Sequence, residues 1–250
     1  MDKQSLILIY GASSGIGKAT TIKLNSHRIK IVAVGRNYEK LEKLKQDVLY
    51  PELLELEVKD VGKNVSDFKN WINTLVKKYG AFSGFVHSAG VLNPQPLKLI
   101  NYTDVIDDFN INLFSMLFTI KELVKKNNHQ EYLNIVCVSS IAAFVGSAGS
   151  LTYAMTKASI NNMVSSIAQE IGSKYIHINA VCPGGIITPM TEQYNENLTY
   201  DYLEKCRKKN VLHEDGKPEY IADVISFLLS ENSYWIQGQC YTVDGGETLS

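Results

Sequence analysis

The sequence has no long apolar run, no excess of one charge and few cysteines, and each absence narrows the possible functions. No stretch reaches the roughly 18 apolar residues of a membrane-spanning helix, and the run at 6–10 is too short for a signal-peptide core. Lys and Arg number 25 against 26 for Asp and Glu, a net charge of -1, which gives no reason to expect nucleic-acid or membrane binding. We therefore expect a cytoplasmic protein that binds a small molecule.

The few cysteines also argue against a metal site. Cys137, Cys182, Cys206 and Cys240 lie far apart, form no C-x-x-C pair and have no His-rich neighbourhood. We expect buried free thiols and no bound metal. With 250 residues the chain can be organised around one hydrophobic core, so we expect a single domain over 1–250.

Short apolar stretches alternate with segments of helical periodicity along the chain. This alternation predicts a parallel sheet with helices on both faces, which is a doubly wound (Rossmann-type) α/β fold. The seven expected strands span 5–10, 29–34, 53–58, 82–87, 132–139, 175–182 and 239–243. The expected helices span 15–26, 37–49, 64–79, 101–127, 152–173 and 218–230. The polar segment 184–217 shows no clear period, and we expect it to be a substrate lid.

A glycine-rich turn follows the first expected strand directly and opens the first helix. It reads Gly11-Ala12-Ser13-Ser14-Gly15-Ile16-Gly17, with the spacing G-x-x-x-G-x-G. Glycines let the backbone turn tightly and approach a pyrophosphate, whose charge the free N–H groups and the positive helix end would meet. The turn therefore predicts a dinucleotide site, with a plain tight turn as the alternative.

The end of the second expected strand indicates which dinucleotide binds. In many such folds an acidic residue about 20 positions after the turn binds the ribose 2′-hydroxyl of NAD(H). Here the strand ends in Gly35, Arg36 and Asn37, without a carboxylate. The planar guanidinium of Arg36 suits a 2′-phosphate, so we expect NADP(H) in preference to NAD(H). The alternative is an exposed arginine at a strand end, with NAD(H) as cofactor.

A second motif places Ser139 and Ser140 after the fifth expected strand and Tyr153 and Lys157 on the helix that follows. Tyr153 and Lys157 are i and i+4, so a helix carries them on one face. A free tyrosine has a pKa of about 10, and the charges of Lys157 and an oxidised nicotinamide would lower it. Tyr153 could then act as general acid and base, while Ser140 donates a hydrogen bond to the substrate oxygen.

The glycine turn, Ser140, Tyr153 and Lys157, in this order, resemble the short-chain dehydrogenase/reductase family along essentially the whole chain. Within the family, the sequence most resembles 3-oxoacyl-carrier-protein reductases and sugar or polyol dehydrogenases. Further matching segments are His87-Ser88-Ala89-Gly90, Asn112, Asp60-Val61, Pro183-Gly184-Gly185-Ile186-Ile187-Thr188 and Val243-Asp244-Gly245-Gly246. The resemblance implies reversible hydride transfer between NADP(H) and a carbonyl/secondary-alcohol pair, in a homotetramer or alternatively a homodimer.

The resemblance also implies roles for individual residues. Asn112, Ser140, Tyr153 and Lys157 would be catalytic, with Asn112 holding a water that links Lys157 to solvent. Lys157 would also bind the nicotinamide ribose. The cofactor would contact Gly11, Ser13, Ser14, Gly15, Ile16, Gly17, Arg36, Asp60, Val61, Ala89, Gly90, Tyr153, Lys157, Pro183, Gly184, Ile186 and Thr188. The expected substrate pocket is largely apolar and comprises Leu92, Ala142, Phe144, Val145, Gly185, Met190 and Tyr194.

Three residues depart from the family pattern. Tyr10 stands where a threonine usually begins the glycine motif, and His87 and Ser88 replace two asparagines. These changes leave open how the turn after 82–87 is braced. The pKa of a free histidine lies near neutrality, but we expect His87 to be held by backbone groups rather than to be catalytic.

Several alternatives remain open. Asn112 could be a side-chain-bonded residue within a helix, and Thr188 could be a helix cap. The basic residues of 205–209 could dock an acyl carrier or simply form a solvated helix face. A non-catalytic NADP-binding sensor or scaffold would need none of the four catalytic residues. A sugar-nucleotide epimerase shares Y-x-x-x-K, but usually has G-x-x-G-x-x-G and a longer C-terminal region.

Overall fold

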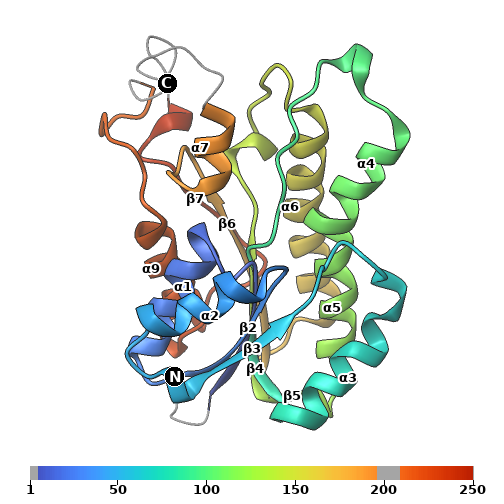
Figure 1. Ribbon diagram of the computed structural model, residues 1–250, viewed down its shortest axis with the longest axis vertical. Coiled ribbons are helices and arrows are strands. Elements are labelled where there is room, and N and C mark those ends of the chain that lie inside the picture. The colour runs from blue at the N-terminus through green and yellow to red at the C-terminus, as the bar shows by residue number, and fades with distance from the viewer. Residues whose placement is uncertain (1–4, 196–208, 250) are drawn as a thin grey trace.

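The computed structural model describes residues 5–195 and 209–249, which form one parallel sheet between two layers of helices (Figure 1). The strands are β1 (Leu6–Tyr10), β2 (Lys30–Gly35), β3 (Leu54–Val58), β4 (Phe82–His87), β5 (His129–Val138), β6 (Ile176–Pro183) and β7 (Cys240–Val243). Their order is β3-β2-β1-β4-β5-β6-β7, and every neighbouring pair is parallel. The predicted doubly wound seven-stranded fold is confirmed.

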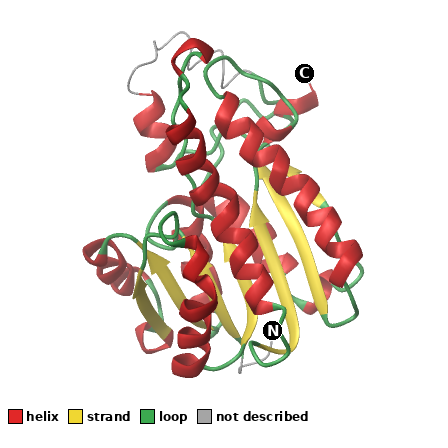
Figure 2. Cartoon of the chain, turned by 90° about the vertical axis from the view of Figure 1, so that its right-hand side faces the viewer, coloured by secondary structure: helices red, strands yellow, loops and turns green. Residues whose placement is uncertain are grey.

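The two helical layers bury the two faces of the sheet separately. One layer contains α1 (Gly15–Ser26), α2 (Tyr38–Asp47) and α9 (Pro218–Leu228), and the other contains α3 (Phe68–Tyr79), α4 (Tyr102–Phe109), α5 (Ser115–Leu123) and α6 (Leu151–Ile171). Figure 2 views the sheet through this second layer. Strands covered on both faces must be apolar throughout, which explains the continuous run at β1, where all five side chains are buried.

Two segments differ from the expected elements. The helix expected at 101–127 is interrupted between α4 and α5 by a π-helical turn, Asn110–Phe114. Such a turn inserts an extra residue and shifts the side chains that follow, which apolar periodicity does not reveal. β5 begins at His129, three residues before the expected 132–139. Its first four side chains are partly or fully exposed, so they carry no apolar signal.

The segment expected to be a lid, 184–217, contains the short helix α7 (Pro189–Asn195) and an isolated bridge between Ile186 and Gly216. Positions 196–208 lie outside the described residues, and with them Lys205, Cys206, Arg207 and Lys208. Acyl-carrier docking at these positions therefore stays a prediction.

The predictions on thiols can be checked over 5–195 and 209–249. Cys137, Cys182 and Cys240 are all free, as expected. Cys137 and Cys182 are also buried, as expected, but Cys240 is only partly buried. Within the same residues no group of three His, Cys, Asp or Glu side chains could hold a metal ion. No helix in this part of the chain has the length and apolar character to cross a membrane.

The order of the strands locates the site. The connections run in opposite directions from β1 and β4, so a crevice opens where these two strands end. β1 ends at Tyr10 just before the glycine turn, and β4 ends at His87. β5 lies next to β4 and leads into Ser139 and Ser140. Both sequence motifs therefore meet at the carboxyl edge of the sheet.

Candidate active site

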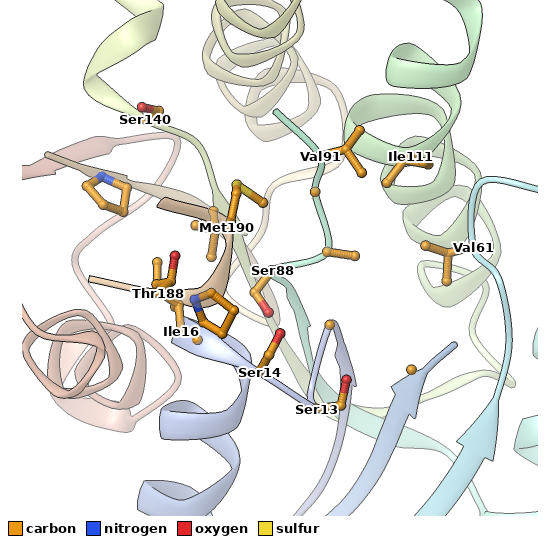
Figure 3. Close-up of a pocket in the computed structure, with 18 of the residues that line it drawn as sticks. Ser13, Ser14, Ile16, Val61, Ser88, Val91, Ile111, Ser140, Thr188 and Met190 are labelled. Carbon is orange, nitrogen blue, oxygen red and sulfur yellow. The ribbon is translucent and has the colours of Figure 1, made fainter. Parts of the chain in front are cut away.

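A cavity occupies this edge and collects residues from both motifs (Figure 3). Its lining includes almost all the residues predicted to contact the cofactor, namely Gly11, Ser13, Ser14, Gly15, Ile16, Arg36, Asp60, Val61, Ala89, Gly90, Tyr153, Lys157, Pro183, Gly184, Ile186 and Thr188. Ser140 also lines it. The structure thus brings the glycine turn and the Ser-Tyr-Lys motif to one cavity.

The glycine turn is shaped by backbone conformations that other residues would not tolerate. Gly11 has φ of +74°, and a Cβ there would lie 2.7 Å from the Ala89 backbone nitrogen. A Cβ on Gly17 would lie 2.3 Å from both the Gly11 carbonyl oxygen and Ser88 Oγ. Gly17 is buried and is not part of the cavity lining, so it serves to pack the turn closely.

The start of α1 borders this cavity, because Ser14, Gly15 and Ile16 line it, and the first N–H groups of a helix have no partner within the helix. Ser14 precedes the helix but its side chain makes no capping hydrogen bond, and no acidic residue lies in the first turn. The positive end of α1 is thus left for an anionic ligand. These features fit the pyrophosphate of a dinucleotide.

Ser88 holds the end of β4 in place. Its backbone N–H and its hydroxyl both donate to the Tyr10 carbonyl, at 3.1 and 2.7 Å. These two hydrogen bonds join the end of β4 to the end of β1, where the glycine turn begins. The serine found in place of an asparagine therefore keeps the turn in position.

Arg36 lines the cavity, directly follows the end of β2 and is exposed. A Cβ at Gly35 would lie 3.1 Å from Ser13 Oγ, so glycine lets the Ser13 hydroxyl approach this strand end. Among the described residues, Arg36 makes no ion pair with a carboxylate. Asp60 also lines the cavity, with one oxygen accepting from the Gly62 N–H at 3.0 Å. A guanidinium and a hydroxyl are thus available to a phosphate group.

Helix α6, which carries Tyr153 and Lys157, is tied to the end of β5 by its lysine. Lys157 is buried, and its Nζ donates to the Val138 carbonyl at 2.8 Å. The Ser139 hydroxyl donates to the Lys157 carbonyl at 3.1 Å. Ser140 Oγ accepts from the Ala142 N–H at 3.1 Å, which orients its hydroxyl. Lys157 Nζ lies 5.3 Å from the centre of the Tyr153 ring.

Burial controls the charges of this pair. It lowers the pKa of Lys157 to about 8, because the ammonium is removed from water. Burial also raises the pKa of Tyr153, and a hydrogen bond with Ser140 opposes this only in part. The lowering expected from Lys157 together with an oxidised nicotinamide stays a prediction. In the structure the effect of burial on the Tyr153 pKa is larger than the opposing effect of the Ser140 hydrogen bond.

Asn112 lies in the π-helical turn, fully buried behind the cavity. Its Oδ1 accepts from the Val91 N–H at 2.8 Å, and its Nδ2 donates to the Val91 carbonyl at 3.0 Å and to Thr156 Oγ1 at 3.1 Å. Asn112 is therefore a helical residue whose side chain is held by hydrogen bonds, which was the alternative interpretation from the sequence. It fixes Val91, which lines the cavity, against α6.

Thr188 both lines the cavity and caps α7. Its Oγ1 accepts from the Thr191 N–H at 3.3 Å, while the Thr188 N–H donates to Thr191 Oγ1 at 2.8 Å. The capping interpretation is thus confirmed, and it is compatible with a hydroxyl directed to a ligand. Figure 3 shows Thr188 beside Ile16, across the cavity from Val61.

The substrate end of the cavity differs from the expected one. Of the predicted pocket residues only Met190 belongs to the lining, whereas Leu92, Ala142, Phe144, Val145 and Gly185 do not, and the Tyr194 side chain lies outside the description. The sequence analysis missed Val91, Ile111 and Lys59, which do line it. Lys59 directly precedes Asp60 at the end of β3, so its position at the sheet edge could have identified it. Val91 and Ile111 carry no such signal.

Comparisons with known proteins agree with this geometry. A family model described as enoyl-(acyl carrier protein) reductase matches residues 11–248. The chain belongs to the short-chain dehydrogenase/reductase family. It is 34% identical over 242 residues to the 3-oxoacyl-(acyl-carrier-protein) reductase of Thermotoga maritima, covering 96% of each protein. It is 30% identical to the 7alpha-hydroxysteroid dehydrogenase of Bacteroides fragilis, over 99% of this chain and 95% of that one.

Solved structures show the same fold. A short-chain dehydrogenase/reductase from Brucella melitensis superposes with a TM-score of 0.89 at 24% identity, over 99% of this chain and 97% of that one. ElxO, in a structure with NADP bound, gives 0.89 at 26% identity, over 99% and 100%. The chain is thus an oxidoreductase of this family.

Proposed function

We propose that this protein transfers hydride reversibly between NADP(H) and a carbonyl/secondary-alcohol pair, with Tyr153 as general acid and base. The observation that carries the proposal is the single cavity in which the glycine turn, Arg36 and the Ser140-Tyr153-Lys157 group meet. A non-catalytic NADP-binding scaffold would have no need for the second group.

The glycine turn and the start of α1 give the cavity features that fit a dinucleotide. Gly11 and Gly17 let the turn pack against Ala89 and Ser88 more closely than any other residue would allow, and the start of α1 is open to an anion. The glycine turn would hold the pyrophosphate, and Ile186 and Thr188 would orient the carboxamide. When bound, the cofactor supplies or accepts the hydride. This arrangement supports a cofactor lying along the carboxyl edge of the sheet.

Tyr153, Ser140 and Lys157 divide the work on the substrate oxygen. The Ser140 hydroxyl donates a hydrogen bond to that oxygen, where negative charge develops. Tyr153 is a protonated phenol at neutral pH because burial raises its pKa, so it can deliver its proton to the same oxygen during reduction. Lys157 would bind the nicotinamide ribose and keep a positive charge near the phenol. This charge would lower the free energy of the phenolate that forms when Tyr153 gives up its proton. Asn112 supports them by fixing Val91, and a water held by Asn112 stays a prediction.

Arg36 supports a preference for NADP(H) over NAD(H). It lines the cavity without a carboxylate partner among the described residues, close to the position where NAD(H)-binding folds place an acidic residue. ElxO, a relative solved with NADP bound, is consistent with this preference.

We further propose a cytoplasmic homotetramer, or a homodimer, with residues 1–250 as one domain. The packing of both apolar clusters on the same sheet supports a single domain. The exposure of large apolar side chains such as Tyr102 and Trp235 supports assembly, and the cytoplasmic location stays a prediction. Light scattering of the purified protein measures the assembly directly.

The proposed reaction is tested with NADPH and a panel of carbonyl compounds that includes 3-oxoacyl thioesters, oxosteroids and ketoses. We expect the wild-type protein to consume NADPH with at least one of them. Tyr153→Phe removes only the hydroxyl and should lower kcat by about 100- to 10,000-fold, as expected when a general acid is lost, while NADPH still binds. Full turnover by Tyr153→Phe would refute the mechanism.

A further inference from the structure

A buried histidine lies behind the catalytic helix, on the side of the sheet that α5 and α6 cover. His87 is the last residue of β4 and is fully buried. Its Nε2 is 2.7 Å from Ser115 Oγ, at the start of α5. Its Nδ1 is also buried but hydrogen-bonds to no atom of the described residues. A buried polar atom without a partner is costly and rare in folded proteins.

The partners of Ser115 determine which imidazole nitrogen carries the hydrogen. The Ser115 hydroxyl has a single hydrogen, which it donates to the Ile111 carbonyl at 2.7 Å within the π-helical turn. Ser115 Oγ can therefore only accept from His87, so the hydrogen of the neutral ring is on Nε2. Nδ1 is then a bare lone pair that can only accept a hydrogen bond.

The ammonium of Lys157 is held close to His87 along β5: His87 is paired in register with Cys137, and Lys157 Nζ donates to the carbonyl of the next residue, Val138, at 2.8 Å. Burial and, next, the positive charge of Lys157 lower the pKa of His87 to about 3, so the ring stays neutral. Lys157 Nζ uses one of its three hydrogens on the Val138 carbonyl and makes no direct bond to Nδ1. The ammonium thus has hydrogens left to donate, and the imidazole has a lone pair left to accept.

Other titratable groups around Lys157 do not fill this role. Cys137 of β5 is a neutral thiol, because burial raises its pKa to about 12. Cys182 of β6 interacts with Lys157 electrostatically, but its contacts are to Cys240, Ser139 and Asn161. Tyr153 of α6 presents its ring to the ammonium. Tyr10 of β1, beside His87, hydrogen-bonds to Thr119 Oγ1 at 2.8 Å. Among these groups, His87 alone offers an uncommitted nitrogen lone pair, which is a far stronger acceptor than a thiol sulfur.

We propose that His87 is a positioning residue for Lys157: its Nδ1 accepts a hydrogen bond from a buried water that the Lys157 ammonium also holds. This inference rests on the proposed function, since Lys157 matters through its effect on Tyr153. A water with two or more polar partners is the usual way in which buried groups of this kind are satisfied. Through Nε2 and Ser115, the imidazole links this water to the Ile111 carbonyl and so to the π-helical turn that carries Asn112.

The function of the link is to keep Lys157 charged. A hydrogen bond to the charged form of a group favours that form, so the water and His87 raise the pKa of the ammonium against the effect of burial. A charged Lys157 in turn lowers the pKa of Tyr153. Loss of the acceptor should therefore raise the pH at which Tyr153 becomes a phenolate, which is the form needed for alcohol oxidation.

The test compares the pH dependence of alcohol oxidation in three variants. His87→Phe keeps an aromatic ring next to Tyr10 and Phe85 but has no acceptor. In the pH profile of kcat for alcohol oxidation, we expect the rising limb to shift to higher pH by about half a pH unit or more. His87→Asn restores an acceptor and should return the limb toward the wild-type position. Tyr10→Phe removes a hydroxyl from the same buried layer, on the side of Thr119, and should leave the limb unmoved.

The outcomes separate a positioning role from a structural one. If His87 only supported the fold, His87→Phe would lower kcat equally at all pH values, or lower the unfolding temperature alone, and the proposal would be overturned. A second measurement does not depend on activity: a high-resolution crystal structure of the wild-type protein should show a water within hydrogen-bond distance of both His87 Nδ1 and Lys157 Nζ. A structure without that water would overturn the proposal even if the protein proves to be an oxidoreductase. If the wild type turned over no carbonyl or alcohol, the proposed function would fail and the crystal structure would still decide the role of His87.

Discussion

The two halves of the cavity are built in different ways. The half in which we propose that the cofactor binds, the cofactor half, is made from backbone N–H groups, glycines and one exposed arginine, Arg36. The half that we propose to be catalytic, the catalytic half, depends on buried polar side chains that form hydrogen bonds with other side chains or with backbone groups, such as Lys157, Asn112 and His87. On our proposal the first half recognises the cofactor by shape and charge. In the second half, burial shifts the pKa values of Tyr153 and Lys157 away from those the groups have in water.

The largest expected effect comes from removing the buried charge. Lys157→Met keeps the length and apolar stem but deletes the ammonium, and should reduce kcat for carbonyl reduction by about 100-fold or more. Alcohol oxidation at neutral pH should fall further, because Tyr153 would form a phenolate only at higher pH. Steady-state rates in both directions, measured across pH, provide the check.

Lys121→Met serves as the matched control, since Lys121 is exposed in the last turn of α5. It should retain wild-type rates. Equal losses in the two variants would show that the effect is not specific to the buried ammonium.

We expect an intermediate effect, on stability and NADPH affinity, from a substitution that disturbs the close packing of the glycine turn. Gly17→Ala would place a Cβ 2.3 Å from the Gly11 carbonyl oxygen, so the turn must shift, at a cost to folding of about 1–3 kcal/mol. NADPH affinity should fall because the N–H groups of α1 move with the turn. Denaturant unfolding and NADPH titration measure the two effects.

Gly146→Ala is the control for this change, because a Cβ there would have no neighbour within 4 Å. It should alter neither stability nor affinity. A Gly17→Ala protein that bound NADPH as tightly as wild type would contradict the close-packed turn.

The smallest expected effect on catalysis comes from the exposed arginine, which should change cofactor choice alone. Arg36→Ala should reduce the preference for NADPH over NADH by about 10- to 100-fold, the range expected for lost hydrogen bonds to a charged phosphate. Affinity for NADH should stay the same, and so should kcat at saturating cofactor.

Lys40→Ala on the exposed face of α2 controls for a general change in surface charge. If Arg36→Ala left the ratio of the two dissociation constants unchanged, the assignment of NADP(H) on Arg36 would be wrong.

The cofactor half was largely predictable from the sequence, because its signals are local. The turn at Gly11–Gly17, the helix it opens and the strand that ends before Arg36 all follow from short-range patterns. Even α1 begins and ends where its periodicity predicts, at Gly15 and Ser26.

The catalytic half was predictable only in its motif. The π-helical turn at Asn110–Phe114 interrupts a continuous helical pattern, and the bonds from Asn112 to Val91 and Thr156 join segments far apart in the chain. The raised pKa of Tyr153 likewise comes from burial, which the spacing of Tyr153 and Lys157 does not reveal. Tertiary packing decided each of these features.

The most direct test of the account is the stoichiometry of the reaction. With a carbonyl compound that the protein turns over, NADPH loss and alcohol formation are followed together in the same sample. One alcohol formed for each NADPH consumed is the result we predict, because each NADPH transfers one hydride to one carbonyl group. Tight NADPH binding without consumption on the whole panel, or product formed without net loss of NADPH, would contradict it.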